Sequence, residues 1–197
     1  DSQNIIFGHE SSYKEYKFTD KIIQLQIDSS NLCFSTKSSF YILNNDRIST
    51  SYEYSRNLND FRILNNGLVV LAFGDTMYEI FDMRIPDKIF SSSFQTGNNI
   101  LDCQVSPLNN LFCFCQQNSC SIYDFRNPNF EIMSFEATKS KNASYQARWI
   151  GDDRLIAVAN DDGYYNLVNI TSNSAQILQT HSLQPGKILN LNTTDDT

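Results

Sequence analysis

Three cysteines lie close enough in the sequence to supply thiol ligands to one metal ion. Cys113 and Cys115 alternate within an apolar run, so a β-strand would direct both to one face, and a hairpin would bring Cys120 opposite them. A tetrahedral zinc site needs a fourth ligand, however, and zinc cysteines usually come as two pairs separated by two to four residues. The pattern therefore favours three small, buried apolar side chains, and we predict no metal and no cofactor.

Two segments place an arginine two residues after an aspartate at the end of an apolar run. The first contains Asp82 and Arg84, and the second contains Asp124 and Arg126. A guanidinium can bind a carboxylate through two parallel hydrogen bonds, which lysine cannot reproduce. We therefore expect each arginine to bind a carboxylate of a neighbouring structural repeat.

Few other residues offer catalytic chemistry. The two histidines are His9 and His181, and the adjacent acids Asp152-Asp153 and Asp161-Asp162 fall in predicted solvated turns. The chain has seven glycines and contains no phosphate-binding glycine loop, serine elbow or His-rich zinc motif. We predict that the protein is not an enzyme.

Composition narrows the class of protein further. Aromatic residues make up 13% of the 197 residues, which favours β-strands, and the net charge of −7 argues against direct nucleic-acid binding. No apolar run approaches the roughly 18 residues of a membrane span, so no membrane insertion is expected. Five cysteines form no even disulfide framework, which favours a reducing, intracellular compartment, either cytoplasm or nucleus.

The elements that would position these residues recur along the chain. Each repeat has a half-buried strand with alternating polar and apolar residues, a tight turn, a continuously apolar second strand, a third strand and a weaker, polar fourth strand. The second strands begin at Leu32, Leu68, Leu111 and Leu155, and equivalent landmarks recur at intervals of 36 to 45 residues. Four antiparallel strands at this period are typical of a β-propeller blade.

The third strands carry a resemblance to the WD-repeat family, in which this strand ends in Trp-Asp, often followed by another residue and Arg. Here the motif reads Phe81-Asp82-Met83-Arg84 and Tyr123-Asp124-Phe125-Arg126, and it is reduced to Leu43-Asn44 and Val168-Asn169 in the other repeats. The resemblance covers residues 20–180. It implies an all-β propeller of WD-repeat type with about four four-stranded antiparallel blades, and we expect these to form an arc of a ring of about seven.

The predicted organisation follows from these repeats. We expect an outer strand of a preceding blade with a linker, four blades, and a tail or the start of another blade; the ranges are 1–19, 20–57, 58–97, 98–140, 141–182 and 183–197. The apolar faces of each blade need neighbours. We therefore expect the remaining blades to come from chain outside this sequence or from a partner.

A rigid propeller that exposes loops on two rims favours a non-catalytic scaffold, a subunit that binds other protein subunits. Polar residues early in the first strands are the candidate partner-binding residues: Gln24, Asp60, Asp102, Tyr145 and Gln146. Tyr145 is the aromatic among them and the expected hot spot. The alternative function is a substrate or peptide receptor. The family resemblance implies that Asp82, Arg84, Asp124 and Arg126 could bind a ubiquitin-ligase adaptor, and the acidic charge would suit basic, histone-like tails.

Overall fold

We analysed a computed structural model of the chain. It describes residues 3–9, 12–18, 20–28, 31–44, 47–64, 67–84, 88–93, 99–108, 110–117, 119–136, 145–161, 163–171 and 174–182. The chain divides into two compact units, which are described separately below. The first comprises residues 1–73 and 78–91, and the second comprises residues 74–77 and 92–197.

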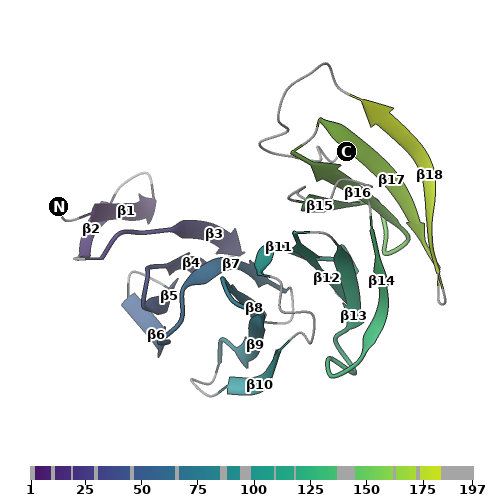
Figure 1. The fold of residues 1–197 in the computed structure, drawn as a ribbon. Coiled ribbons are helices and arrows are strands. Elements are labelled where there is room, and N and C mark those ends of the chain that lie inside the picture. Colours follow the sequence, from purple (N-terminus) through teal and green to yellow (C-terminus); the bar gives the residue numbers. More distant parts are fainter. Residues whose placement is uncertain are drawn as a thin grey trace. The chain divides into compact units, whose positions relative to one another are not determined.

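The described residues form eighteen β-strands (Figure 1). They are β1 (Gln3–His9), β2 (Ser12–Phe18), β3 (Gln24–Asp28), β4 (Asn31–Ser35), β5 (Ser39–Asn44), β6 (Arg47–Glu53), β7 (Leu58–Ile63), β8 (Leu68–Phe73), β9 (Met77–Asp82), β10 (Lys88–Ser93), β11 (Ile100–Val105), β12 (Leu111–Gln116), β13 (Cys120–Asp124), β14 (Glu131–Phe135), β15 (Tyr145–Ile150), β16 (Leu155–Asn160), β17 (Tyr164–Ile170) and β18 (Ala175–Ser182). Within this part of the chain, no helix is long and apolar enough to span a bilayer.

Sixteen of these strands form four four-stranded sheets in which each strand lies beside the next one in sequence: β3 to β6, β7 to β10, β11 to β14 and β15 to β18. The recorded strand pairs are antiparallel, as in the pairing of Ile27 with Leu32 and of Cys115 with Cys120. The predicted all-β fold with four antiparallel, four-stranded blades is therefore confirmed. The sheets fall within the four predicted segments, whose exact boundaries stay predictions. The predicted tail, 183–197, lies outside the described residues.

The burial of the strands follows the residue types. Strands β8, β12 and β16 begin half-buried and are then buried at every position, as predicted for apolar strands covered on both faces. Strand β15 alternates between buried and half-buried residues. The fourth strands β14 and β18 are largely exposed, in keeping with their position at a sheet edge.

Turn chemistry sets the hairpins between the first and second strands. Gly67 and Gly151 have φ values of 83° and 72°, in the left-handed region that side chains disfavour. Gly151 directly follows the end of β15, and Gly67 lies in the turn after β7. The Gly67 amide donates to the Leu64 carbonyl at 3.0 Å. These two predicted turns are therefore explained by the backbone freedom of glycine.

Aromatic rings fill the core of the first unit. The Phe40 ring of β5 packs edge-on against Phe61 of β7 and Phe81 of β9, with ring centroids 5.0 and 5.2 Å apart. All three side chains are buried. These contacts join the sheet that begins with β3 to the sheet that begins with β7 through interdigitated apolar side chains.

The first unit also contains a strand that the sequence reasoning missed. Residues 1–19 were predicted to hold one outer strand, but β1 and β2 pair over their whole lengths as a two-stranded sheet. Tyr16 and Phe18 of β2 pack against the apolar cluster of Leu32, Phe34 and Leu43. The alternation of Tyr16 and Phe18 with charged residues was the available signal for a half-buried strand.

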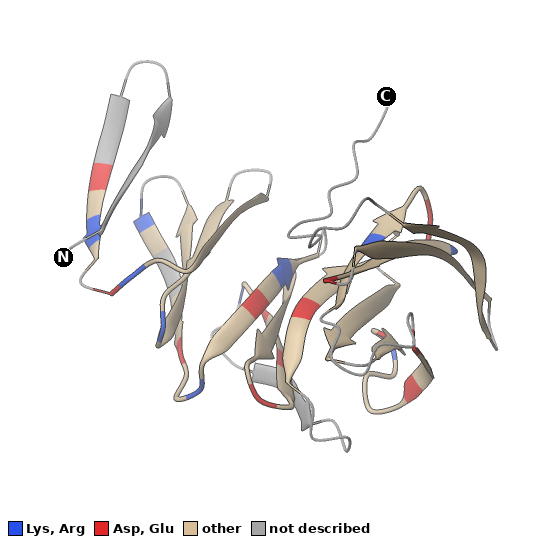
Figure 2. Ribbon diagram, turned by 45° about the horizontal axis from the view of Figure 1, so that its top comes forward, with Lys and Arg blue, Asp and Glu red and all other residues tan. Residues whose placement is uncertain are grey.

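An apolar cluster also joins the two sheets of the second unit. Cys113, Cys115, Cys120 and Ile122 lie on one side of it, and the buried residues of β15, Tyr145, Ala147 and Trp149, lie on the other. Trp149 is buried, which confirms its predicted place in the core. Among the described residues, Lys and Arg are scattered over strands and loops and form no continuous basic stretch (Figure 2).

Candidate functional site

Both Asp-x-Arg motifs have the same geometry at the ends of β9 and β13. The Arg84 backbone amide and Nε donate to Asp82 Oδ1 at 2.9 and 2.8 Å, and its Nη2 donates to Asp82 Oδ2. Arg126 repeats these contacts with Asp124, at 2.8 Å from the amide and 2.9 Å from Nε. The bidentate pairing was predicted correctly, but the predicted partner was wrong, because each arginine binds its own aspartate two residues earlier and not a neighbouring repeat.

These pairs leave the arginines at the surface. The side chains of Arg84 and Arg126 are 73% and 83% exposed, whereas those of Asp82 and Asp124 are 10% and 17% exposed. Hydrogen bonds from the arginine, and its charge, hold the pKa of each aspartate below its usual range. The aspartate therefore fixes the direction of an exposed guanidinium, which has further N–H groups for another molecule.

A cavity of about 700 Å³ lies beside Asp124 and Arg126 in the second unit. Its wall combines apolar side chains with charged ones: Leu111, Ile122, Asp124, Arg126, Ile132, Met133, Asp153, Arg154, Asn169, Ile170 and Thr171. The residues come from β12, β13 and β14 of one sheet and from β17 and the turn before β16 of the next. The volume is in the range of pockets that hold a small molecule or a side chain of a partner protein.

The charged side chains of the cavity differ in the hydrogen bonds that they make. Asp153 accepts hydrogen bonds from the Leu108 amide and from Asn110 Nδ2, both at 3.1 Å. The Arg154 side chain is 82% exposed, and its Nε lies 3.9 Å from Asp152. Arg126 and Arg154 thus offer exposed guanidinium groups beside an apolar surface, a combination suited to binding.

Gln24 and Asp102, whose partner binding stays a prediction, make hydrogen bonds to the first strand of the following sheet. The Gln24 carboxamide accepts from the Phe61 amide and donates to the Phe61 carbonyl, both at 3.2 Å, and Gln26 donates to the same carbonyl at 2.8 Å. Asp102 Oδ2 accepts from the Ala147 amide at 2.9 Å. Because β7 and β15 are edge strands, these side chains cap backbone groups that the sheet itself leaves unpaired.

The other predicted rim residues lie in a similar polar row. Asp60 is 6% exposed and binds Arg62 Nη1 at 2.7 Å, and Asp102 also binds Arg148 Nη1 at 2.9 Å. Gln146 is half-buried on β15. The ion pairs of Asp60 and Asp102 account for their burial.

Tyr145 is not at a rim. Its side chain is 1% exposed and belongs to the apolar cluster of the second unit, so its expected role as an exposed aromatic hot spot is wrong. The first residue of β15 begins the buried face of that strand, which Ala147 and Trp149 continue. The register of β15 determines that Tyr145 is buried, because a shift of one residue would have placed its side chain on the opposite face of the sheet.

The sequence reasoning named Asp124, Arg126 and Asp153 but missed the cavity that gathers them. Arg154 and Ile132 belong to different repeats and come together through the packing of two sheets. The available signal was the exposed position of both residues at strand ends. That signal alone does not say which strand ends meet.

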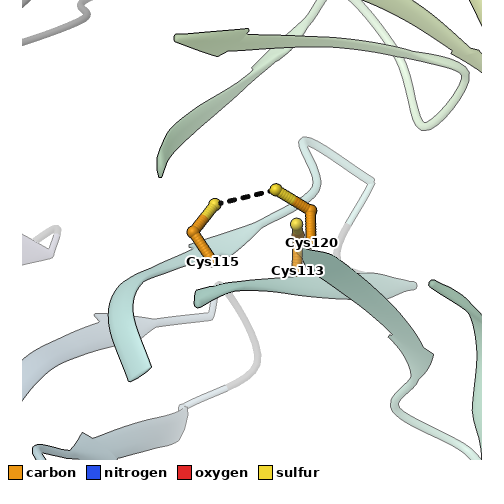
Figure 3. A group of neighbouring side chains, drawn as sticks. All are labelled: Cys113, Cys115 and Cys120. Carbon is orange, nitrogen blue, oxygen red and sulfur yellow. Dashed lines mark hydrogen bonds between the residues drawn. The ribbon is translucent and has the colours of Figure 1, made fainter. Parts of the chain in front are cut away.

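A second group of side chains could bind a metal ion. The Sγ atoms of Cys113, Cys115 and Cys120 all lie within 4.8 Å of one another, and each of these cysteines is buried (Figure 3). Among the described residues, His181 does not contribute to this group, because its ring stacks on Tyr165 at 4.8 Å.

Comparison with known proteins identifies the fold. No model of a protein family matches the sequence, and no curated protein matches it. Solved structures do match: KlHsv2 with its loop 6CD replaced by a Gly-Ser linker superposes with a TM-score of 0.71 at 13% identity, over 92% of this chain and 71% of that one. A chain of the mitotic checkpoint complex superposes with a TM-score of 0.74 at 9% identity, over 88% of this chain and 56% of that one.

The identities are low and 1242 chains match, so the likeness defines the fold and does not select a function. The present chain spans little more than half of the matched chain of the mitotic checkpoint complex. From the four blade-like sheets and these matches together, the chain has the fold of WD40 propellers.

Proposed function

We propose that the chain is a non-catalytic, WD-repeat interaction module that binds another protein subunit through the cavity of its second unit. The observation that carries the proposal is the combination of an apolar wall with the exposed Arg126 and Arg154 around about 700 Å³. Arginine is among the residues enriched at the energetic centres of protein interfaces, which lie in well-packed pockets. The fold supports the proposal, since WD40 propellers are generally interaction scaffolds.

The cavity suits a partner's apolar side chain that has an acidic residue next to it. Leu111, Ile122, Ile132, Met133 and Ile170 provide apolar surface for the first, and the unused N–H groups of the two arginines provide donors for the second. The pairing of Asp124 with Arg126 fixes one of these donors before binding, which lowers the entropy cost of ordering it. The number of blades in the complete ring stays a prediction.

The test introduces a glutamate at two exposed apolar positions, one in the cavity wall and one outside it. Ile132 lines the cavity and is 39% exposed, whereas Phe130 is 68% exposed and does not line it. The tagged native protein is purified with its partners, and the stoichiometric partner is quantified by mass spectrometry. Ile132→Glu should weaken its binding by about tenfold or more, while Phe130→Glu should leave it within about twofold. Equal loss or equal retention in the two variants would contradict the cavity as the binding site.

The second candidate function is docking to a ubiquitin-ligase adaptor through the two Asp-x-Arg motifs. The favouring observation is that Arg84 and Arg126 are held in the same bidentate geometry and are both highly exposed. Replacing both arginines with alanine should abolish capture of the adaptor. Unchanged capture, or no capture by the natural sequence, would remove this candidate.

A receptor for basic tails differs from both in its salt dependence. The charge of −7 favours cationic peptides, and attraction between exposed charges weakens as salt is added. Short basic peptides should then bind the isolated protein several-fold more weakly at 0.5 M than at 0.05 M salt, measured by fluorescence anisotropy. Binding that does not change with salt would exclude this receptor function.

A further inference from the structure

The three clustered cysteines belong to a single hairpin. Cys115 of β12 and Cys120 of β13 are direct cross-strand partners, and Cys113 lies two residues before Cys115 on the same face. The Sγ atoms of Cys115 and Cys120 are 3.4 Å apart, and all three Sγ atoms lie within 4.8 Å of one another. In Figure 3 the three sulfur atoms lie on the same side of the hairpin.

The thiols are closed off from solvent, and Asp102, the cross-strand partner of Cys115, lies on the same face of the sheet. All three cysteines are 0% exposed, and they pack in the cluster that includes Tyr145 and Val158 of the next sheet. All three are free thiols. Burial raises the pKa of the Cys115 and Cys120 thiols well above the usual range.

The sulfur positions match the spacing that one metal ion requires. A metal–sulfur bond of about 2.3 Å puts the sulfur atoms of a trigonal or tetrahedral site roughly 4 Å apart. The observed separations span this value, so side-chain adjustments of less than an ångström would bring the three atoms to one centre. Such convergence is not required of cysteines that only fill space in a core.

The ligand set selects the class of metal. Zinc is disfavoured because a structural zinc site is closed by four ligands, and the described residues supply three thiols to this group. Soft sulfur ligands select Cu(I), which needs no fourth ligand and carries a single charge. We propose that Cys113, Cys115 and Cys120 form a binding site for a soft monovalent metal ion, Cu(I) being the biological example.

Charge limits how many protons the site releases. Binding of Cu(I) with loss of two thiol protons gives a bis-thiolate complex with a net charge of −1, and the third thiol keeps its proton as a weaker neutral ligand. Losing the third proton as well would place a second uncompensated negative charge in the core.

The test is a competition titration of the full reduced chain under anaerobic conditions, with Cu(I) supplied as its bicinchoninate complex. One Cu(I) per chain should transfer to the protein, with a thiolate-to-copper absorption band in the near ultraviolet. Cys115→Ala and Cys120→Ala should each weaken binding by about tenfold or more, since removal leaves two sulfur ligands and the third sulfur contact is lost. Cys103→Ala is the matched control: Cys103 is also buried in this unit, but it pairs with Phe114 and so lies on the other face of the sheet. It should leave the affinity unchanged.

Two results would overturn the proposal. One is transfer of Cu(I) to Cys115→Ala as tight as to the natural sequence, and the other is no transfer to the natural sequence at all. X-ray absorption of the loaded natural protein tests the site without any variant that has to fold. It should show two or three sulfur neighbours at about 2.2–2.3 Å, whereas nitrogen or oxygen neighbours would contradict a thiol site.

Discussion

Asp102 shows how a buried carboxylate is stabilised in this fold. It accepts hydrogen bonds from Gln104 Nε2 at 3.0 Å, from the Ala147 amide at 2.9 Å and from Arg148 Nη1 at 2.9 Å. Two of the three donors belong to the following sheet. The side chain therefore joins two sheets of the second unit by charge-assisted hydrogen bonds.

Replacing Asp102 with alanine should lower the free energy of unfolding by about 2–4 kcal/mol, because Arg148 and the Ala147 amide would lose their acceptor in a mostly buried position. Urea unfolding followed by tryptophan fluorescence would measure the change, since Trp149 lies two residues from Ala147 on the same strand. Asp152→Ala is the control. The Asp152 side chain is 54% exposed and its removal should cost less than about 0.5 kcal/mol. Similar losses from both substitutions would contradict the special role of Asp102.

The pKa of Asp124 provides a direct test of the Asp-x-Arg geometry. Hydrogen bonds from Arg126 hold this pKa below its usual range, so the pair persists at neutral pH and is lost as the pH falls through the lowered value. Arg126→Ala should raise the pKa of Asp124, and Arg126→Lys should restore only part of the lowering. Carbon-13 NMR titration of the carboxyl group measures this. No change in Arg126→Ala would refute the pairing.

At the scale of elements, the hydrogen bonds from Gln24 to β7 are the clearest target. A carboxamide has one carbonyl and one amide group like a peptide unit, and here it pairs with both backbone groups of Phe61. Gln24→Ala should lower the free energy of unfolding by about 1–2 kcal/mol, and Gln24→Glu should also destabilise because a carboxylate cannot donate to the Phe61 carbonyl. Both are measured by urea unfolding.

Gln176 provides the matched control for Gln24, because it is an exposed glutamine on β18. Gln176→Ala should change the stability by less than about 0.5 kcal/mol. If the two alanine variants were equally stable, the contacts of Gln24 would contribute nothing to the packing of the sheets.

The strands themselves were predictable because each repeat carries its own periodic pattern. Leu32, Leu68, Leu111 and Leu155 all lie in second strands, as predicted. Burial of the cysteines and of Trp149 followed from their apolar neighbours. By contrast, β2 is rich in charged residues and gains its apolar contacts from another sheet, so its own sequence gave only a weak signal.

The candidate site was less predictable, for two physical reasons. Polar residue type does not reveal whether a side chain faces a partner or caps a neighbouring edge strand, and Gln24 and Asp102 do the latter. The cavity arises between two sheets, so residues such as Ile132 and Arg154 meet only through tertiary packing. The direction of Arg84 and Arg126 depends on backbone geometry at the strand end, which composition does not specify.

At the scale of the whole molecule, the first unit presents an apolar row to solvent. Ile23, Leu25 and Ile27 alternate along β3 and the residue before it, so they lie on one face, and they are 45%, 46% and 69% exposed. Exposed apolar rows of this kind promote association between molecules. We therefore expect the isolated chain to self-associate as its concentration rises.

The double substitution Leu25→Thr with Ile27→Thr should shift the chain toward monomer, measured by size-exclusion chromatography with light scattering. Thr is β-branched and favours strands, so the fold should be retained, which circular dichroism checks. Leu108→Thr is the control, since Leu108 is 62% exposed in a turn of the other unit. A monomeric natural chain, or an equal shift in the control, would contradict the prediction.

The hydrogen bonds that cap β7 and β15 have a consequence for how such a sequence can evolve. These hydrogen bonds are made to backbone atoms. The residues that provide those atoms at equivalent positions have side chains as different as those of Phe61 and Ala147. Such a contact does not depend on the side chain of the residue that receives it, provided that the residue has a backbone N–H, which proline lacks. Repeats joined in this way can lose their sequence motifs while the fold is retained. The fold can then be recognised when sequence similarity no longer can.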